Sequence, residues 1–126
     1  MRIRPIDQTE RAQVQKYLML DEALLYSLIP PYLPEHRGTA FAPKGQVAAG
    51  RKKVDEIRGK LHEKICGEWQ LCDKIEDAAF KDAVNLVVVV GDAISAVTVG
   101  IPPVLVASLL VKIGLRKFCG CTQQAA

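Results

Sequence analysis

The sequence predicts an all-α fold: a four-helix, bundle-like single domain over residues 1–126, with an apolar helical hairpin at about 84–118 as its centre. Two charged segments carry apolar residues every three or four positions, which is typical of amphipathic helices. The most apolar segment, residues 86–121, is divided by two consecutive prolines. The chain has 126 residues, 49% hydrophobic and 25% charged, which is enough for one domain with a sizeable core.

The first helix is expected over residues 8–28. Asp7 precedes it, and Glu10 follows three residues later, which is the spacing of a capping box. Apolar residues then recur at helical spacing as far as Leu28. Pro30 ends the helix, because proline lacks the amide donor that a helix interior needs.

The next segment, residues 29–46, holds four of the seven prolines and cannot be a continuous helix. It is either a loose linker or an ordered strap over the core. Tyr32, Leu33 and Phe41 favour the strap, because a solvated linker seldom carries three large apolar side chains.

A long amphipathic helix is predicted over residues 47–82. Its apolar positions step by three or four, and the opposite face is charged. The apolar positions are Val54, Ile57, Leu61, Ile65, Trp69 (or Cys72), Ile75 and Ala79. Trp69, the single tryptophan, belongs to the buried face or its rim. As an alternative it is an exposed contact for another protein, since tryptophan is enriched at interface hot spots.

Residues 83–99 are the ambiguous element. Four consecutive valines suit a buried strand, but no convincing partner strand is present elsewhere in the sequence. As a helix, the segment places Asn85, Asp92 and Ser95 on one narrow stripe, which favours the helical interpretation. Gly100 is expected to cap the end of this helix.

The last helix is expected over residues 104–118, with Pro102 and Pro103 at its entrance and a frayed tail at 119–126. A hairpin turning about Pro102 would bring Asp92 level with Lys112. We interpret these two residues as a structural ion pair, although an acid and base in a proton or ion path is an alternative. The same register places Asn85 near Cys119.

The polar positions of this helix also form a stripe. Ser108, Lys112 and Arg116 stand at spacings of four, so they are expected on one side of the helix. The polar stripes of the two helices would then face a common direction, as the outer edge of the hairpin.

The same apolar segment raises the alternative of a membrane-associated protein that inserts the 84–118 hairpin. Residues 93–111 carry no charge, and Arg116 and Lys117 follow as a cytoplasmic flank would. Against a single span, the two prolines interrupt the window, and each half is too short to cross a bilayer. The segment also lacks a belt of Trp and Tyr.

The net charge of +3 is small and gives no reason to expect a nucleic-acid partner. The charged start of the sequence has no apolar run of the kind that a signal peptide needs, so we expect a cytoplasmic protein, with membrane localisation as the alternative. In the cytosol the four cysteines, Cys66, Cys72, Cys119 and Cys121, would be reduced thiols.

A Cys/His metal site or thiol sensor is a further alternative. His62 and Cys66 share a helix face, and the CGC motif at Cys119 and Cys121 could supply more zinc ligands. The spacing is not that of structural zinc sites, and the hairpin register leaves His62 ~30 Å from Cys119. The favoured interpretation is that the cysteines are small, buried apolar side chains.

The sequence contains no catalytic triad ordering, phosphate-binding loop or dinucleotide fingerprint, so we expect no enzyme and no cofactor. The function favoured is non-enzymatic: a small helical protein for protein–protein interaction or self-assembly, with a protein partner or a homo-oligomer. Trp69, Tyr32 and Leu33 are the candidate interface residues.

Overall fold

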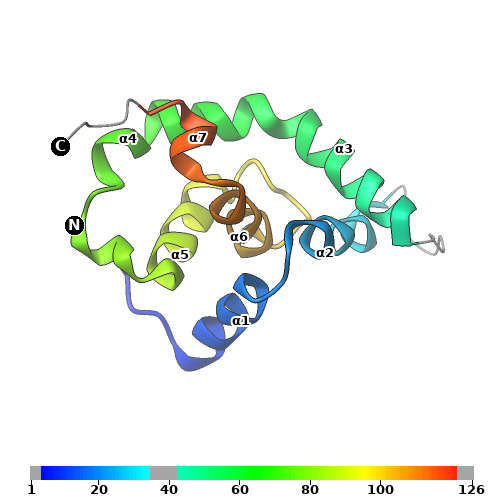
Figure 1. The fold of residues 1–126 in the computed structure, drawn as a ribbon, viewed down its shortest axis with the longest axis horizontal. Helices are drawn as coiled ribbons and strands as arrows, with labels where there is room; N and C mark the ends of the chain where they lie inside the picture. Colours follow the sequence, from blue (N-terminus) through cyan, green and yellow to red (C-terminus); the bar gives the residue numbers. More distant parts are fainter. Residues whose placement is uncertain (1–3, 35–42, 122–126) are drawn as a thin grey trace.

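The computed structural model confirms the all-α class. It describes residues 4–34 and 43–121, and within these ranges it contains helices and no strand. Figure 1 shows α6 (Pro103–Ile113) near the centre, with α3 (Pro43–His62) running along one edge and the shorter helices around it.

The chain folds into shorter pieces than the sequence predicts. In order they are α1 (Gln8–Leu18), α2 (Glu22–Ser27), the 3-10 turn η1 (Pro30–Tyr32), α3, the π-helical turn η3 (Glu63–Glu68), α4 (Leu71–Lys74), the 3-10 turn η4 (Ala78–Lys81), α5 (Ala83–Ile94), α6 and α7 (Leu115–Cys119). Each expected long helix is interrupted at a residue that caps a new turn or adopts a non-helical conformation.

The expected helix at 8–28 divides into α1 and α2. The N-cap prediction is confirmed, because a carboxylate oxygen of Asp7 accepts from the Glu10 amide at 2.7 Å. The helix stops at Leu18 because Asp21 starts a second one, accepting from the Leu24 amide at 2.8 Å. Of the predicted strap, residues 30–32 form η1, while residues 35–42, including Phe41, lie outside the described residues.

The long amphipathic helix is real but shorter than 47–82. It starts at Pro43 and changes after His62 to the wider, π-helical hydrogen bonding of η3. It ends at Trp69, whose amide donates to the Lys64 carbonyl five residues earlier at 3.0 Å. Gln70 follows with φ 58°, a left-handed conformation that turns the chain into α4. Three of the predicted core positions are fully or almost fully buried: Val54, Leu61 and Ile65.

Residues 83–94 and 103–113 form a helical hairpin, so the helical interpretation of the valine run is confirmed. The predicted turn about Pro102 is wrong, because the connection runs from Ser95 to Pro102 and Gly100 lies within it. A side chain at Gly91 would meet Val104 at 3.4 Å, which places these two residues level. The register is therefore shifted by about nine residues from the predicted one.

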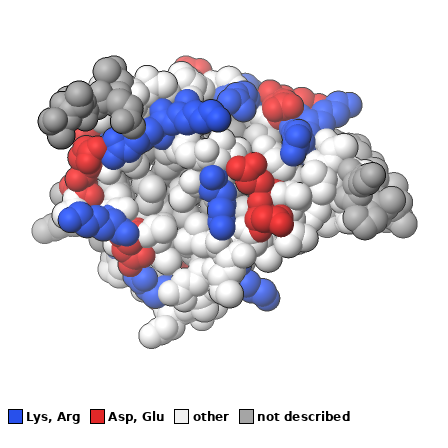
Figure 2. All heavy atoms as spheres, in the orientation of Figure 1, with Lys and Arg blue, Asp and Glu red and all other residues white. Residues whose placement is uncertain are grey.

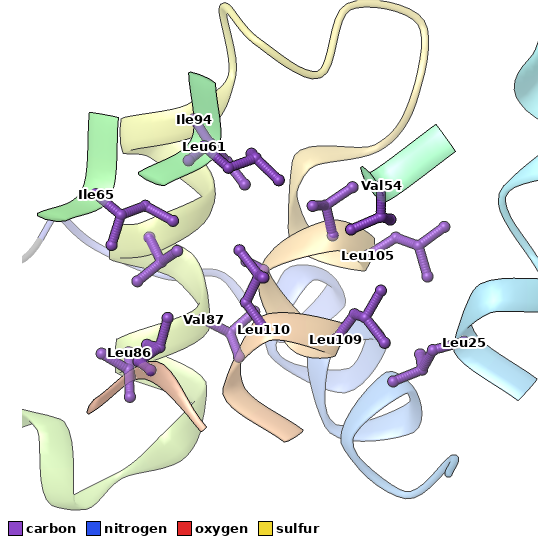
Figure 3. Packing of buried hydrophobic residues seen from close by; sticks show 14 of the residues in the cluster. Leu25, Val54, Leu61, Ile65, Leu86, Val87, Ile94, Leu105, Leu109 and Leu110 are labelled. Atoms are coloured by element: carbon purple, nitrogen blue, oxygen red, sulfur yellow. The ribbon is translucent and has the colours of Figure 1, made fainter. Parts of the chain in front are cut away.

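The core is centred on α6. All six residues from Leu105 to Leu110 are buried, so this helix is enclosed on every side. Figure 3 shows Leu61 beside Ile94 and Val54 beside Leu105, which places the apolar face of α3 against the hairpin. Burying one Leu or Val side chain contributes about 1.5–3 kcal/mol, so this hairpin is the main source of hydrophobic stabilisation.

The hairpin does not have the dimensions of a membrane span. Its helices have 12 and 11 residues, whereas a bilayer crossing takes ~20. Across residues 4–34 and 43–121, the structure contains no helix with both the length and the hydrophobicity for a crossing. Insertion of this hairpin would require α6 to leave its contacts with α1 and α2.

Candidate functional site: an apolar groove and a disulfide-linked corner

A groove of about 320 Å³ opens between α1 and the α2–η1 segment. Its lining residues are Gln13, Lys16, Tyr17, Leu20, Leu28 and Tyr32. The groove exists because the chain breaks after Leu18, so α1 and α2 meet at an angle instead of forming one rod. Its walls are mostly apolar, with an amide and an ammonium group at one rim.

Tyr17 gives the groove a polar point within its apolar wall. Burial raises the pKa of Tyr17 above its ordinary value, and the neighbouring Tyr32 adds to this rise. The side-chain amide of Gln13 donates to the Tyr17 hydroxyl at 3.4 Å and opposes the shift. The phenol is therefore neutral at physiological pH and offers a hydroxyl to an occupant of the groove.

Large exposed apolar side chains occur on the segments that form this groove. Met19 is 85% exposed, Leu24 is 50% exposed and Tyr32 is 41% exposed. Met19 adjoins the groove residue Leu20, and Leu24 lies one helical turn before the groove residue Leu28. Exposed apolar side chains next to a groove make these residues candidates for an interaction site.

A fourth exposed apolar residue, Val99, is 82% exposed in the α5–α6 connection. A side chain built on its neighbour Gly100 would lie 4.0 Å from the Tyr32 carbonyl oxygen. The connection therefore lies close to η1, whose Tyr32 lines the groove.

The predicted interface residues lie in three different settings. Tyr32 lines the groove, but Leu33 is only 4% exposed and belongs to the core. Trp69 is half-buried on the far side of the molecule, where its ring meets Phe80 edge-on at 5.8 Å. The Lys74 ammonium lies 5.2 Å from the Trp69 ring and donates to its carbonyl at 2.6 Å. Trp69 thus occupies the rim of the core, as its spacing indicated.

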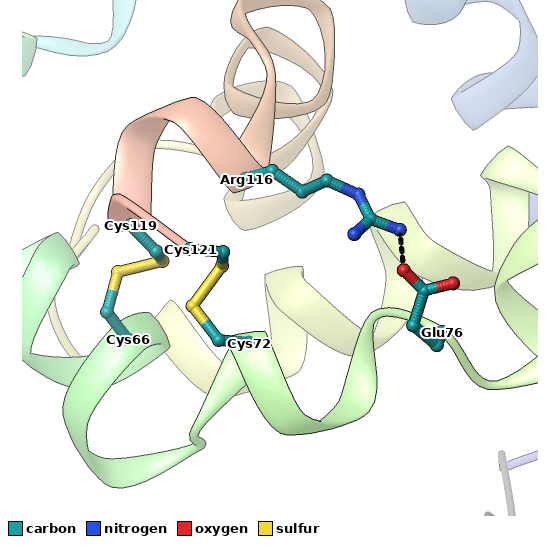
Figure 4. The surroundings of a disulfide bond; sticks show 6 residues. All are labelled: Cys66, Cys72, Glu76, Arg116, Cys119 and Cys121. Carbon is teal, nitrogen blue, oxygen red and sulfur yellow. Dashed lines mark ion pairs between the residues drawn. A yellow bond between two sulfur atoms is a disulfide. The ribbon is translucent and has the colours of Figure 1, made fainter. Parts of the chain in front are cut away.

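The second notable region is a corner held by two disulfides (Figure 4), Cys66–Cys119 and Cys72–Cys121. The expectation of reduced thiols is wrong, since all four cysteines are paired. That expectation rested on a cytosolic location, and disulfides persist mainly in oxidising compartments. The localisation itself stays a prediction.

The chain reaches this corner through a sharp turn at Gly114. Its φ of 111° is outside the range that other residues adopt readily, and it allows α7 to fold back from the end of α6. Phe118 of α7 then packs 5.6 Å from the His62 ring and 5.2 Å from the Arg58 guanidinium. Arg58, His62 and Cys66 are spaced by four, so they form one stripe along which α7 lies.

An ion pair and a small hollow complete the corner. The guanidinium of Arg116 pairs with the carboxylate of Glu76 (Figure 4). The backbone carbonyl of Arg116 accepts from the Cys121 amide at 2.9 Å. A hollow of about 210 Å³ adjoins α7, lined by Ile75, Leu86, Val111, Gly114, Leu115 and Arg116. The carboxy-terminal segment is thus attached by covalent, ionic and apolar contacts together.

The geometry gives the metal alternative no support. The expected separation between His62 and Cys119 is wrong, because Cys119 is bonded to Cys66 and not placed near Asn85. The paired sulfurs are not available as thiolate ligands. The part of the chain that the structure describes contains no group of three or more His, Cys, Asp or Glu side chains able to hold a metal.

The predicted ion pair between Asp92 and Lys112 is not formed. Asp92 instead accepts from Arg4 at 2.8 Å, and Arg4 also pairs with Glu10 at 2.6 Å. The register shift is the reason, because Asp92 now lies level with the start of α6 and not with its end. Lys112 is exposed and forms no ion pair with a described residue.

Three polar side chains of the hairpin stripes form hydrogen bonds with nearby backbone carbonyls. The Asn85 amide donates to the Ala79 carbonyl at 3.0 Å, and the Ser95 hydroxyl donates to the Asp92 carbonyl at 3.2 Å. Ser108 is fully buried and donates to the Val104 carbonyl at 2.7 Å. The predicted common polar edge is therefore wrong, since Ser108 lies in the core.

On the face drawn in Figure 2, charged side chains of both signs stand in groups among uncharged residues. Figure 2 shows Lys and Arg side chains in a row along the edge formed by α3 and α7, with acidic side chains beside them. No protein-family model matches this chain, and neither a curated protein nor a solved structure is significantly similar to it.

Proposed function

We propose that this protein is a non-enzymatic, self-assembling helical protein whose chains dimerise through the groove between α1 and α2. The observation that carries the proposal is an exposed methionine next to an apolar groove. Met19 is 85% exposed beside a groove of about 320 Å³.

A two-fold axis turns this arrangement into a closed interface. In such a contact the same patch is used by both subunits, so Met19 of each chain can enter the groove of the other. Methionine suits this role because its flexible, unbranched side chain adapts to irregular apolar walls. Leu24 and Tyr32 would become buried at the same time.

The groove also has the polar elements of an interface rim. Lys16 and Gln13 stand at its edge, and the Tyr17 hydroxyl lies between apolar residues. An apolar centre with a polar rim is the usual anatomy of a protein interface. Tyrosine in addition is enriched among hot-spot residues.

Sedimentation equilibrium over a concentration series tests the proposal. The unmodified protein is expected to dimerise reversibly. Burying one methionine is worth about 1.5–3 kcal/mol, and the two-fold dimer buries one from each chain. Met19→Asp should therefore raise the dimer Kd by roughly 100- to 10,000-fold. Leu24→Asp should act in the same direction.

Ala83→Asp is the matched control, because Ala83 is exposed at the start of α5 and away from the groove. It should leave the dimer Kd unchanged. Circular dichroism would check that all variants keep their helices. A protein that stays monomeric up to millimolar concentration would contradict self-assembly, as would equal effects of Met19→Asp and Ala83→Asp.

A further inference from the structure

The two disulfides of the corner differ in their surroundings. Cys66, Cys119 and Cys121 are partly buried and pack against the hydrophobic core. Cys72 is exposed in the first turn of α4 and is not part of that cluster. The Cys72–Cys121 bond is therefore approachable from solvent through one of its sulfur-bearing residues, whereas the Cys66–Cys119 bond joins two residues that pack on the core.

We propose that the Cys72–Cys121 disulfide is a thiol–disulfide exchange site, that Cys72 carries the sulfur attacked, and that its substrate is a dithiol. Exchange proceeds by attack of a thiolate on one sulfur of a disulfide, and access to that sulfur controls the rate. The exposed position of Cys72 selects it over its three half-buried counterparts.

The reaction balances as a two-electron transfer. A thiolate of the dithiol bonds to the Cys72 sulfur, the Cys72–Cys121 bond breaks, and Cys121 leaves as a thiolate that takes a proton from water. The second thiol of the dithiol, as a thiolate, then attacks the dithiol sulfur that is bonded to Cys72. This closes the disulfide within the dithiol and releases the Cys72 thiolate, which is then protonated. The dithiol becomes a disulfide, and the two cysteines become thiols.

The fold can carry this reaction without unfolding. When Cys72–Cys121 opens, Cys66–Cys119 still ties the last residue of α7 to the end of the long helix. Leu115 and Phe118 remain buried, at 4% and 7% exposure. The covalent constraint is removed only from the short stretch that follows Cys119.

The first test is a timed reduction of the native protein with dithiothreitol, with alkylation of free thiols and mapping of the labelled peptides. Cys72 and Cys121 should be labelled on the order of tenfold faster than Cys66 and Cys119, because access controls the exchange rate. Helical circular dichroism should stay constant during this first phase. Equal or reversed rates, or loss of helix with the first bond, would overturn the proposal.

A monothiol identifies the sulfur that is attacked. Reduced glutathione has no second thiol of its own, so when the released Cys121 thiol is alkylated as it forms, the glutathione adduct should be found on Cys72. An adduct mainly on Cys121, or on either residue of the other bridge, would overturn the assignment.

Two paired variants isolate the bonds. In Cys66→Ser/Cys119→Ser the remaining bridge should be reduced at the fast rate of the parent, and in Cys72→Ser/Cys121→Ser the remaining bridge should keep the slow rate. Similar rates in the two variants would count against the proposal. If either variant does not fold, the rates mapped in the parent protein still decide, and dimerisation plays no part in them.

Discussion

The amino-terminal and carboxy-terminal regions are fastened to the central hairpin by different chemistry. Residues 4–34 bury several large side chains, among them Val14, Leu25 and Ile29 with no exposure, and add ion pairs through Arg4 and Arg11. Residues 114–121 bury only Leu115 and Phe118 as large side chains and carry two disulfides.

The difference follows from the amount of surface each region can bury. A five-residue helix such as α7 cannot offset the entropy of ordering its chain with two buried side chains, so covalent bonds supply the remainder. The longer amino-terminal region holds itself by packing and is free to expose Met19 and Leu24. One end of the molecule is thus a fixed corner, and the other presents an apolar surface.

Removal of the disulfides is expected to have the largest effect on stability. The bridges close loops of 53 and 49 residues, and closing one such loop contributes about 4 kcal/mol in the chain-entropy description. Once one bridge exists, the other closes a loop of only about eight residues and contributes about 2.5 kcal/mol. Loss of either bridge should therefore destabilise the protein by about 2.5 kcal/mol, and loss of both by about 6–7 kcal/mol.

Urea unfolding of the two paired serine variants and of the fourfold variant measures these effects. The combined loss should exceed the sum of the single losses, because either bridge alone retains most of the constraint. If the two single losses of unfolding free energy simply add up to the combined loss, the bridges act independently. That result would contradict the description of two bridges that fasten the same corner.

The amino-terminal region depends on packing instead, which Leu25→Ala tests. Leu25 is completely buried in α2, so removing its side chain leaves a cavity and should reduce the free energy of unfolding by about 2–5 kcal/mol. Leu24→Ala is the control, because the neighbouring Leu24 is 50% exposed and should lose well under 1 kcal/mol. Equal losses from the two variants, measured by thermal or urea unfolding, would show that α2 does not pack as described.

The contact between α2 and α3 offers a finer test at Gly50. A methyl group on Gly50 would overlap the carbonyl oxygen of Tyr26, and backbone atoms cannot give way as a side chain can. Gly50→Ala should therefore destabilise the protein by about 1–3 kcal/mol, despite the better helix propensity of alanine.

Gly59→Ala is the matched control in the same helix. A side chain there would meet nothing within 4 Å, so this variant should gain up to about 1 kcal/mol from helix propensity. Unfolding curves in urea should show a loss of stability for Gly50→Ala and a gain for Gly59→Ala. A gain at both positions would mean that the two helices lie farther apart than the structure shows.

The sequence predicted the class of the fold and most of the core, because periodicity reports which face of a helix is apolar. The positions Val54, Leu61 and Ile65 follow directly from that pattern. The breaks at Asp21 and Gly114 were missed. A local cap at Asp21 and a positive φ at Gly114 end helices that the apolar pattern continues through.

The sites were harder to predict than the fold, since they depend on register. The pairing of Asp92 with Lys112 failed because the hairpin connection is longer than a turn at Pro102. The same error placed Cys119 far from Cys66 and hid the disulfides. The clue that remained in the sequence is the spacing of the cysteines: Cys72 follows Cys66 by six positions, and Cys121 follows Cys119 by two.

The smallest predicted effect concerns the charges that fasten the amino-terminal segment. Hydrogen bonding to the Arg4 guanidinium lowers the pKa of Glu10 below its ordinary value, although burial opposes the shift. The folded-state pKa of Glu10 is therefore below its unfolded value. The stability from this pair should be present above the unfolded pKa of Glu10, about 4.3, and be lost as the pH falls through the folded-state value.

Arg4→Gln removes the shift, so this variant should lose less stability between pH 6 and pH 3 than the parent. The difference is expected to be below about 1 kcal/mol, because exposed ion pairs contribute little. Urea unfolding at several pH values measures it, and added salt should reduce it. Parallel pH profiles for the two proteins would show that Arg4 does not hold Glu10.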